Sequence, residues 1–202
     1  MTDIVLGSAS PRRKLLFQMM GINCTVDPSD IEEIIEPDMT PAENVCSLAR
    51  QKATDVATMH KKSIVIAADT IVVKDGTILG KPESPADAAA MLRMLSGDHH
   101  FVYSGVAVYK PEPNQPSEHL VTFYEETKVT FSTLDESEIE QYIASGSPMD
   151  KAGAYGIQDD YGSLFINKIE GDYYNVVGFP VNKFYQTLKR DHPAMFKKVF
   201  NL

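Results

Sequence analysis

Residues 4–21 are IVLGSASPRRKLLFQMMG. The apolar run 4–6 predicts a strand, and the amphipathic stretch 14–20, which stops at Gly21, predicts a helix. Ser10 stands at the expected N-cap of this helix and Pro11 at its first position. A strand that leads through a short turn into a helix is a unit from which α/β folds are built.

The turn between the predicted strand and helix contains two serines, Ser8 and Ser10, and two arginines, Arg12 and Arg13. A helix N-terminus has unpaired N–H groups and a partial positive charge, so it attracts anions. The turn is therefore a candidate phosphate site. The alternative from these residues alone is a capped surface helix with solvated arginines.

The rest of the chain alternates between strand-like and helix-like segments. Strands are expected near 24–26 and over 63–73, 78–79, 101–109, 120–131 and 164–169, with a hairpin turn at Asp75-Gly76. Helices are expected over 41–58, 84–95, 136–144 and 182–189, the last being the final helix, and segment 111–117 is expected to be a proline-rich loop. This pattern favours an α/β fold with a mixed sheet between helices, in a single two-lobed domain spanning 1–202.

Charge and cysteine content narrow the function classes. The chain has 202 residues, a net charge of −9 and two cysteines. The absence of a basic tract argues against a nucleic-acid polymer as partner. Cys24 and Cys46 fit a reduced compartment better than a disulfide framework. With no signal-peptide pattern and no apolar run of membrane-spanning length, we expect a cytoplasmic protein without a membrane partner.

Lys52 is a charged residue on an otherwise apolar helix stripe that includes Val45, Leu48 and Val56. A lysine is rarely buried without a partner. Lys52 therefore either meets a bound anion in a cleft, or packs its stem while the ammonium extends to water.

Asp69 interrupts the most strand-like run of the chain, between Ala67-Ala68 and the apolar residues 71–73. A carboxylate in a central strand is costly unless it is paired or binds a metal, and such a violation of local rules is typical of functional sites. The alternative is an aspartate that caps a turn or pairs with a buried lysine. We favour the functional interpretation.

Lys81 is a further candidate for an anion site, and three carboxylates are candidates for a metal site. Gly80-Lys81-Pro82 follows the predicted hairpin, so Lys81 is either a second cation of the same cleft or a solvated lysine. If a metal is required, oxygen ligands indicate magnesium or manganese shared with substrate phosphates. The carboxylates to consider for it are Glu32, Glu33 and Asp69.

The segment 148–158, PMDKAGAYGIQ, is a glycine-rich loop that ends on an amide side chain, Gln158. An amide offers one acceptor and two donors, which complement the edge of a uracil or thymine base. The alternative is a structural turn with a solvated glutamine.

Six segments together carry a resemblance to a known family. They are Ser8 to Arg13, Ala68-Asp69-Thr70, Leu79-Gly80-Lys81-Pro82, Leu95-Ser96-Gly97, the loop 148–158, and residues 171–180, GDYYNVVGFP. In this order and spacing the chain resembles the Maf family of nucleoside triphosphate pyrophosphatases, from about Ile4 to Pro180. The version Ala154-Tyr155-Gly156-Ile157-Gln158 is similar to the branch that acts on dTTP and UTP.

The resemblance implies an inosine triphosphatase-like fold, with an elongated mixed sheet and a cleft between two lobes, in a homodimer. It implies hydrolysis of dTTP and UTP to the monophosphate and diphosphate with Mg or Mn, in nucleotide-pool sanitation, with modified uridine triphosphates as further candidates. The alternative is a regulatory nucleotide-binding protein in cell division control, without significant turnover.

Residue by residue, the resemblance makes Asp69 the proton acceptor of the reaction. It implies that Arg12, Thr70 and Gln158 set the base preference. Ser8, Arg13, Lys52 and Lys81 match positions associated with phosphate binding or activity. Glu33 matches another such position, and we expect Glu33 and Asp69 to be the metal ligands.

Overall fold

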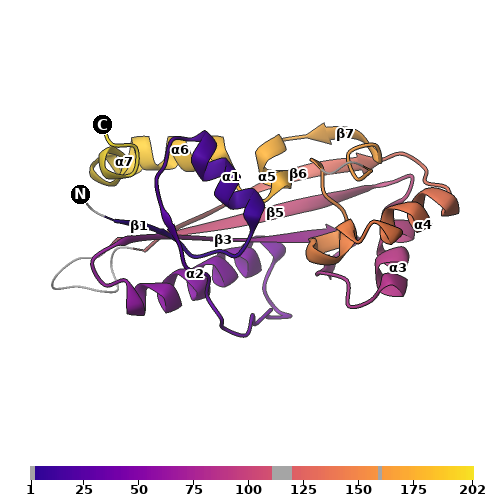
Figure 1. Ribbon diagram of the computed structural model, residues 1–202, viewed down its shortest axis with the longest axis horizontal. Coiled ribbons are helices and arrows are strands. Elements are labelled where there is room, and N and C mark those ends of the chain that lie inside the picture. Colours follow the sequence, from indigo (N-terminus) through magenta and orange to yellow (C-terminus); the bar gives the residue numbers. More distant parts are fainter. Residues whose placement is uncertain (1–2, 111–119, 159–160) are drawn as a thin grey trace. The chain divides into compact units, whose positions relative to one another are not determined.

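The computed structural model describes residues 3–110, 120–158 and 161–202 (Figure 1). The strands in these ranges are β1 (Ile4–Leu6), β2 (Thr25–Val26), β3 (Ile64–Lys74), β4 (Thr77–Leu79), β5 (His99–Tyr109), β6 (Leu120–Phe131) and β7 (Ile166–Glu170). The helices are α1 (Pro11–Met19), α2 (Pro41–Met59), α3 (Pro85–Leu95), α4 (Glu136–Ala144), α5 (Tyr173–Val177), α6 (Val181–Asp191) and α7 (Pro193–Val199). Two short 3-10 turns are η1 (Ser147–Asp150) and η2 (Ala152–Ala154).

The strands belong to one mixed sheet in the order β2-β1-β3-β5-β6-β7, and β4 pairs with β3. β1 is parallel to both β2 and β3, whereas β4 is antiparallel to β3 and β7 to β6. The mixed α/β class predicted from the sequence is therefore confirmed. The proline-rich loop expected at 111–117 lies outside the described residues. No helix in the described ranges combines the length and apolar character needed to cross a membrane.

The chain divides into two compact units. The first comprises Met1–Asp69, Ser104–Glu125 and Gly178–Leu202, and the second Thr70–Tyr103 and Glu126–Val177. β3, β5 and β6 each contribute residues to both units. The expectation of a single two-lobed domain around a cleft stays a prediction.

In the first unit, apolar strands are packed between helices. β1 pairs with β3 in register, Ile4 opposite Ile64 and Leu6 opposite Ile66, and all four of these side chains are buried. Figure 1 shows α2 on one face of these strands, with α1, α6 and α7 on the other. This sandwiching explains why β1 and residues 64–68 of β3 are continuous apolar runs rather than alternating ones.

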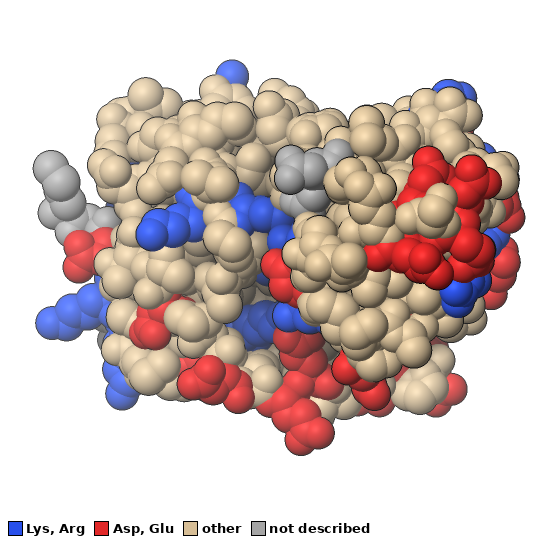
Figure 2. All heavy atoms as spheres, turned by 45° about the vertical axis from the view of Figure 1, so that its right-hand side comes forward, with Lys and Arg blue, Asp and Glu red and all other residues tan. Residues whose placement is uncertain are grey.

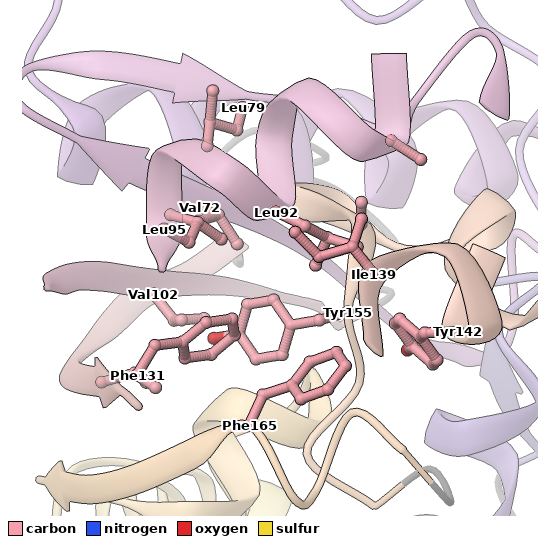
Figure 3. Packing of buried hydrophobic residues seen from close by; sticks show 13 residues of the cluster. Val72, Leu79, Leu92, Leu95, Val102, Phe131, Ile139, Tyr142, Tyr155 and Phe165 are labelled. Atoms are coloured by element: carbon pink, nitrogen blue, oxygen red, sulfur yellow. The ribbon is translucent and has the colours of Figure 1, made fainter. Parts of the chain in front are cut away.

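The second unit has its own hydrophobic core, drawn in Figure 3. Leu92 and Leu95 of α3 and Ile139 of α4 pack there against Phe131 of β6 and Tyr155 of the glycine-rich loop. The Phe131 and Tyr155 ring centroids are 4.7 Å apart in an edge-to-face arrangement. Tyr155 of this loop is therefore part of the core, while Gln158 at the end of the loop is exposed, as the alternative of a structural turn with a solvated glutamine expects.

Two helices were not expected. α7 follows α6, so the prediction that the helix at 182–189 is the last one is wrong. Pro193 ends α6, because a proline inside a helix removes a hydrogen bond, but it starts α7 at the first helical position. α7 is then held by tertiary contacts such as that between Phe196 and Tyr185, at 5.1 Å between ring centroids. α5 has only five residues, too few for a helical repeat to show.

The expected helix start at Ser10 and Pro11 is confirmed, because α1 begins at Pro11 with Ser10 as N-cap. The mode of capping differs from the usual one. The Ser10 side chain makes no capping hydrogen bond, and the Ser10 amide instead donates to Ser8 Oγ at 3.3 Å. The neighbouring serine therefore organises this turn.

Candidate functional site

The turn between β1 and α1 places Ser8 and Arg13 in the interior of the first unit, where they are 6% and 8% exposed. Arg13 Nη1 donates to Ser8 Oγ at 2.9 Å, and Arg13 Nε donates to the Gly178 carbonyl at 2.8 Å. Because β1 and β3 are parallel neighbours, this turn continues beside residues 67–69 of β3. The alternative of a solvated surface arginine is therefore wrong for Arg13.

Lys52 of α2 lies between two carboxylates. Its Nζ is 2.5 Å from Asp69 Oδ1 and 2.7 Å from Glu33 Oε1. The side chains of Lys52 and Asp69 are 13% and 11% exposed, against 49% for Glu33. Lys52 is therefore largely enclosed rather than extended into bulk water, and Asp69 does pair with a partly buried lysine. That pairing is compatible with both interpretations of Asp69, since a catalytic carboxylate beside a cation has the same geometry.

The local sequence explains why Lys52 faces inward. α2 begins with a capping box, in which the Thr40 side chain accepts from the Glu43 amide and the Glu43 side chain accepts from the Thr40 amide. From this start, Lys52 is four residues after Leu48 and four before Val56, both fully buried. Residues four apart share one face of a helix, so Lys52 is directed toward the strands.

Burial and neighbouring cations act on Asp69 in opposite directions. Burial raises the pKa of Asp69, while the positive charges of Lys52 and then Arg13 lower it. Burial likewise lowers the pKa of Arg13, and the Asp69 carboxylate opposes that shift. A carboxyl group with a raised pKa, held beside two cations, is a stronger base than an exposed aspartate.

Sequence reasoning missed Asn44, which holds the loop that carries Glu33. Asn44 is 1% exposed; its Oδ1 accepts from the Glu36 amide at 2.8 Å, and its Nδ2 donates to the Glu36 carbonyl at 2.9 Å. The Nδ2 group also donates to the Met39 carbonyl at 3.2 Å. Asn44 could have been found from the sequence, because it lies four residues before Leu48 and therefore on the buried face of the helix, where a polar side chain is unusual.

The structure groups some of the predicted site residues and not others. Within the first unit it brings together Ser8, Arg13, Glu33, Lys52 and Asp69. Arg12 belongs to the same unit and is half-buried at the start of α1. The remaining three belong to the second unit: Thr70 is half-buried directly after Asp69 in β3, and Lys81 and Gln158 are exposed.

Charge is unevenly spread over the surface. Figure 2 shows one face, on which acidic side chains form one large group at the right and smaller groups along the lower edge, with lysine and arginine side chains scattered among them. A net charge of −9 therefore leaves room for local positive charge, and binding of a small polyanion remains compatible with the composition.

Comparison with known proteins decides the family. Residues 3–191 match the family model described as Maf-like protein. The chain belongs to the Maf family. This Maf chain is 47% identical over 189 residues to a protein of Bacillus pumilus (strain SAFR-032) named dTTP/UTP pyrophosphatase, with 94% of this chain and 96% of the relative covered. A protein of Bacillus mycoides (strain KBAB4) with the same name is 48% identical over 190 residues, with the same two coverages.

Two solved structures are more distant from this Maf protein. The Ham1 protein of Staphylococcus aureus aligns with a TM-score of 0.43 and 16% identity, covering 64% of this chain and 72% of the other. A nucleoside-triphosphatase, or dITP/XTP pyrophosphatase, of Mycobacterium abscessus aligns with a TM-score of 0.43 and 12% identity, covering 96% of this chain and 98% of the other.

The carboxylates of this Maf protein fit a divalent cation. Glu33 and Asp69 both direct an oxygen at one positively charged atom, Lys52 Nζ, so they already share a cation between them. Magnesium is commonly held by one or two carboxylates together with substrate phosphates. The described residues contain no group of three or more His, Cys, Asp or Glu side chains that could hold a metal ion.

Proposed function

We propose that this Maf protein hydrolyses dTTP and UTP to the nucleoside monophosphate and diphosphate. The observation that carries the proposal is the ion pair between the buried Asp69 and the partly buried Lys52, 2.5 Å from Nζ to Oδ1, beside the buried Arg13. It combines a base with cations in one interior cluster, as the hydrolysis of a triphosphate requires. The names of the relatives, which match over nearly their full length, supply the substrate.

In this proposal Asp69 activates the attacking water. Lys52 Nζ lies on Asp69 Oδ1, so we assign the proton of the water to Oδ2. The water oxygen forms a bond to the α-phosphorus, the bond from that phosphorus to the bridging oxygen breaks, and diphosphate leaves. Because the raised pKa of Asp69 makes it a better base, burial contributes directly to the reaction.

The cations orient the triphosphate. Arg13 is fixed by Ser8 and by the Gly178 carbonyl, so its guanidinium needs little reorganisation when a phosphate binds. Lys52 adds a compact positive charge, and we assign Lys81 to the same task. Positioning and charge stabilisation account for most of the catalysis in phosphoryl transfer.

A divalent ion, Mg or Mn, would be held by Glu33 and Asp69 together with the substrate phosphates. When bound, it supplies positive charge to the phosphates and to the leaving diphosphate. Lys52 forms ion pairs with both carboxylates and so holds their oxygens close together before the ion and the substrate bind.

Base preference is assigned to Arg12, Thr70 and Gln158. The exposed Gln158 amide can pair with the edge of uracil or thymine through one donor and one acceptor. The homodimer is also part of the proposal, as is a cytoplasmic location, where nucleotide triphosphates are found. Light scattering of the purified protein measures the dimer.

A substrate panel tests the proposed function. Purified protein is incubated with UTP, dTTP, CTP and GTP in magnesium or manganese, and monophosphate and diphosphate are measured together. We expect equal amounts of both products from UTP and dTTP. Binding of UTP without release of diphosphate would instead favour the regulatory nucleotide-binding protein, and release of single phosphates would contradict cleavage at the α-phosphorus.

Gln158→Ala is expected to weaken the choice among bases more than it lowers the highest rate. Loss of one base-edge hydrogen bond costs roughly 10-fold in discrimination, because the amide pairs correctly with only some bases. The measurement is kcat/KM for UTP, dTTP, CTP and GTP in both proteins. An unchanged ratio of UTP to CTP would count against the assignment of Gln158.

Lys52→Gln is expected to shift the pH dependence of activity upward. Lys52 is the strongest influence that lowers the pKa of Asp69, so its loss raises that pKa further above the ordinary value. Asp69 must be ionised to accept a proton, so the acid limb of the kcat/KM profile moves to higher pH. A profile whose acid limb stays in place, or moves to lower pH, would contradict Asp69 as the titrating base.

A further inference from the structure

The segment 151–158, which we call the base-reading segment, is fixed to the second unit at several points before it ends on Gln158. The Gly153 amide donates to the Gly80 carbonyl at 3.0 Å, and the Gly156 amide donates to Tyr142 Oη at 3.2 Å. Tyr155 lies between these two anchors and is 5% exposed. Figure 3 shows its ring among the core side chains beside Phe131.

Tyr155 is the point where a side chain of the segment is hydrogen-bonded to the sheet. Its hydroxyl is 2.7 Å from Nε2 of His100, near the start of β5. The His100 ring packs edge-to-face against the rings of Tyr155 and Phe131, with centroids 5.2 and 5.0 Å apart. Both partners are thus held in place by packing as well as by the hydrogen bond.

A histidine at position 100 is unfavourable for stability, because it buries a polar ring. It is 1% exposed, and its Nδ1 is buried without a hydrogen-bond partner among the described residues. Burial lowers the pKa of His100 to about 3, so the ring is neutral at ordinary pH. An apolar side chain would fill the same space without an unsatisfied polar atom. Compared with an apolar side chain, the imidazole therefore adds its hydrogen bond to Tyr155.

We infer that His100 is a positioning residue for base selection, because its hydrogen bond to Tyr155 fixes the backbone from which Gln158 presents its amide. The inference rests on the proposed function and assigns to it a residue that does not touch the substrate. Gln158 follows Tyr155 by three residues, so a small displacement of Tyr155 is passed to the amide along a short stretch of backbone. Discrimination between bases requires the donor and acceptor of that amide to stay in register.

Tyr155→Phe isolates the hydrogen bond, because the ring and its contacts remain. We expect the ratio of kcat/KM for UTP to that for CTP to fall roughly 3- to 10-fold, the value of one hydrogen bond, while the highest rate changes less. His100→Leu removes the same bond from the other side. Combining the two substitutions should lower the ratio no further than the larger single effect, since both remove one interaction.

Val129→Ala is the matched control. Val129 is fully buried in the same hydrophobic cluster but takes no part in the His100–Tyr155 hydrogen bond. Its truncation should lower the melting temperature at least as much as Tyr155→Phe and leave the ratio of UTP to CTP unchanged. If Val129→Ala lowers that ratio equally, or if Tyr155→Phe leaves it intact, His100 and Tyr155 are merely structural and the inference fails.

The wild-type protein separates this inference from the proposed function. The Kd for UTP and for CTP is measured by calorimetry alongside turnover for each variant. A wild-type protein that binds UTP selectively without hydrolysing it contradicts the proposed activity, and the Kd ratio of the variants then decides the role of His100. An active, selective wild type with equally selective variants overturns only the positioning role. A wild type that neither binds nor hydrolyses UTP in preference to CTP overturns both.

Discussion

Asp69→Asn is expected to give a folded protein that has lost most of its turnover, by about 100-fold or more, the usual contribution of a general base. Asparagine has the same shape as aspartate but cannot accept the proton of the attacking water. The fold should persist, because the amide oxygen can still accept from Lys52, and Lys52 keeps its ion pair with Glu33. Substrate binding should change less than kcat, since Arg13 remains in place.

Asp98→Asn is the matched control for Asp69→Asn. Asp98 likewise pairs with a lysine, the buried Lys74, since its Oδ2 is 2.6 Å from Lys74 Nζ, but the pair is formed in the second unit. Diphosphate release and thermal unfolding are measured for both variants. Asp98→Asn should lower the melting temperature and leave kcat close to the wild-type value. Near-normal turnover of the Asp69→Asn variant would refute the assignment of Asp69 as the base.

Gly105→Ala is expected to destabilise the protein by about 3 kcal/mol or more and to reduce activity with it. Gly105 lies in β5 against the backbone of α2, and an added Cβ would stand 2.3 Å from the Val45 carbonyl oxygen and 2.5 Å from its carbon. Backbone atoms cannot rotate away as a side chain can, so α2 must move off the strand. α2 carries Lys52, and the Lys52–Asp69 pair would be displaced with it.

Urea denaturation measures this effect, and Gly80→Ala provides its control. A Cβ added at Gly80 meets no atom within 4 Å, so that variant should stay within about 0.5 kcal/mol of the wild type. An unfolding midpoint of Gly105→Ala equal to that of Gly80→Ala would show that α2 does not pack on β5 as closely as described. Diphosphate release at a temperature where both variants are folded then tests whether Lys52 has moved.

Segments with a strong local pattern were predictable. The stripe of α2, the apolar run of β3 and the hairpin turn at Asp75-Gly76 each depend on residues a few positions apart, and all three agree with the structure. α5 was missed because five residues carry no measurable periodicity, and α7 because it is stabilised by packing against α6 rather than by its own sequence. Ser10 was correctly predicted as the N-cap of α1, whereas the hydrogen bond from its amide to Ser8 Oγ became visible only in the structure.

The sequence predicted which residues belong to the candidate site, but it did not predict how they are arranged in space. Lys52 and Asp69 were identifiable because each places a charge where the local pattern requires an apolar side chain. That Lys52 pairs with Asp69 and Glu33 together could not be predicted, because Glu33 belongs to a loop whose course depends on Asn44.

The sequence by itself determined the alternation of strands and helices, the family, and which charged residues stand at apolar positions, because these follow from neighbours along the chain. Only the tertiary structure decided which charges meet. Lys52 and Asp69 are 17 residues apart, and His100 and Tyr155 are 55 apart. The strength of a buried ion pair or hydrogen bond depends on distance in space and on the exclusion of water, and both arise only when the strands and helices pack.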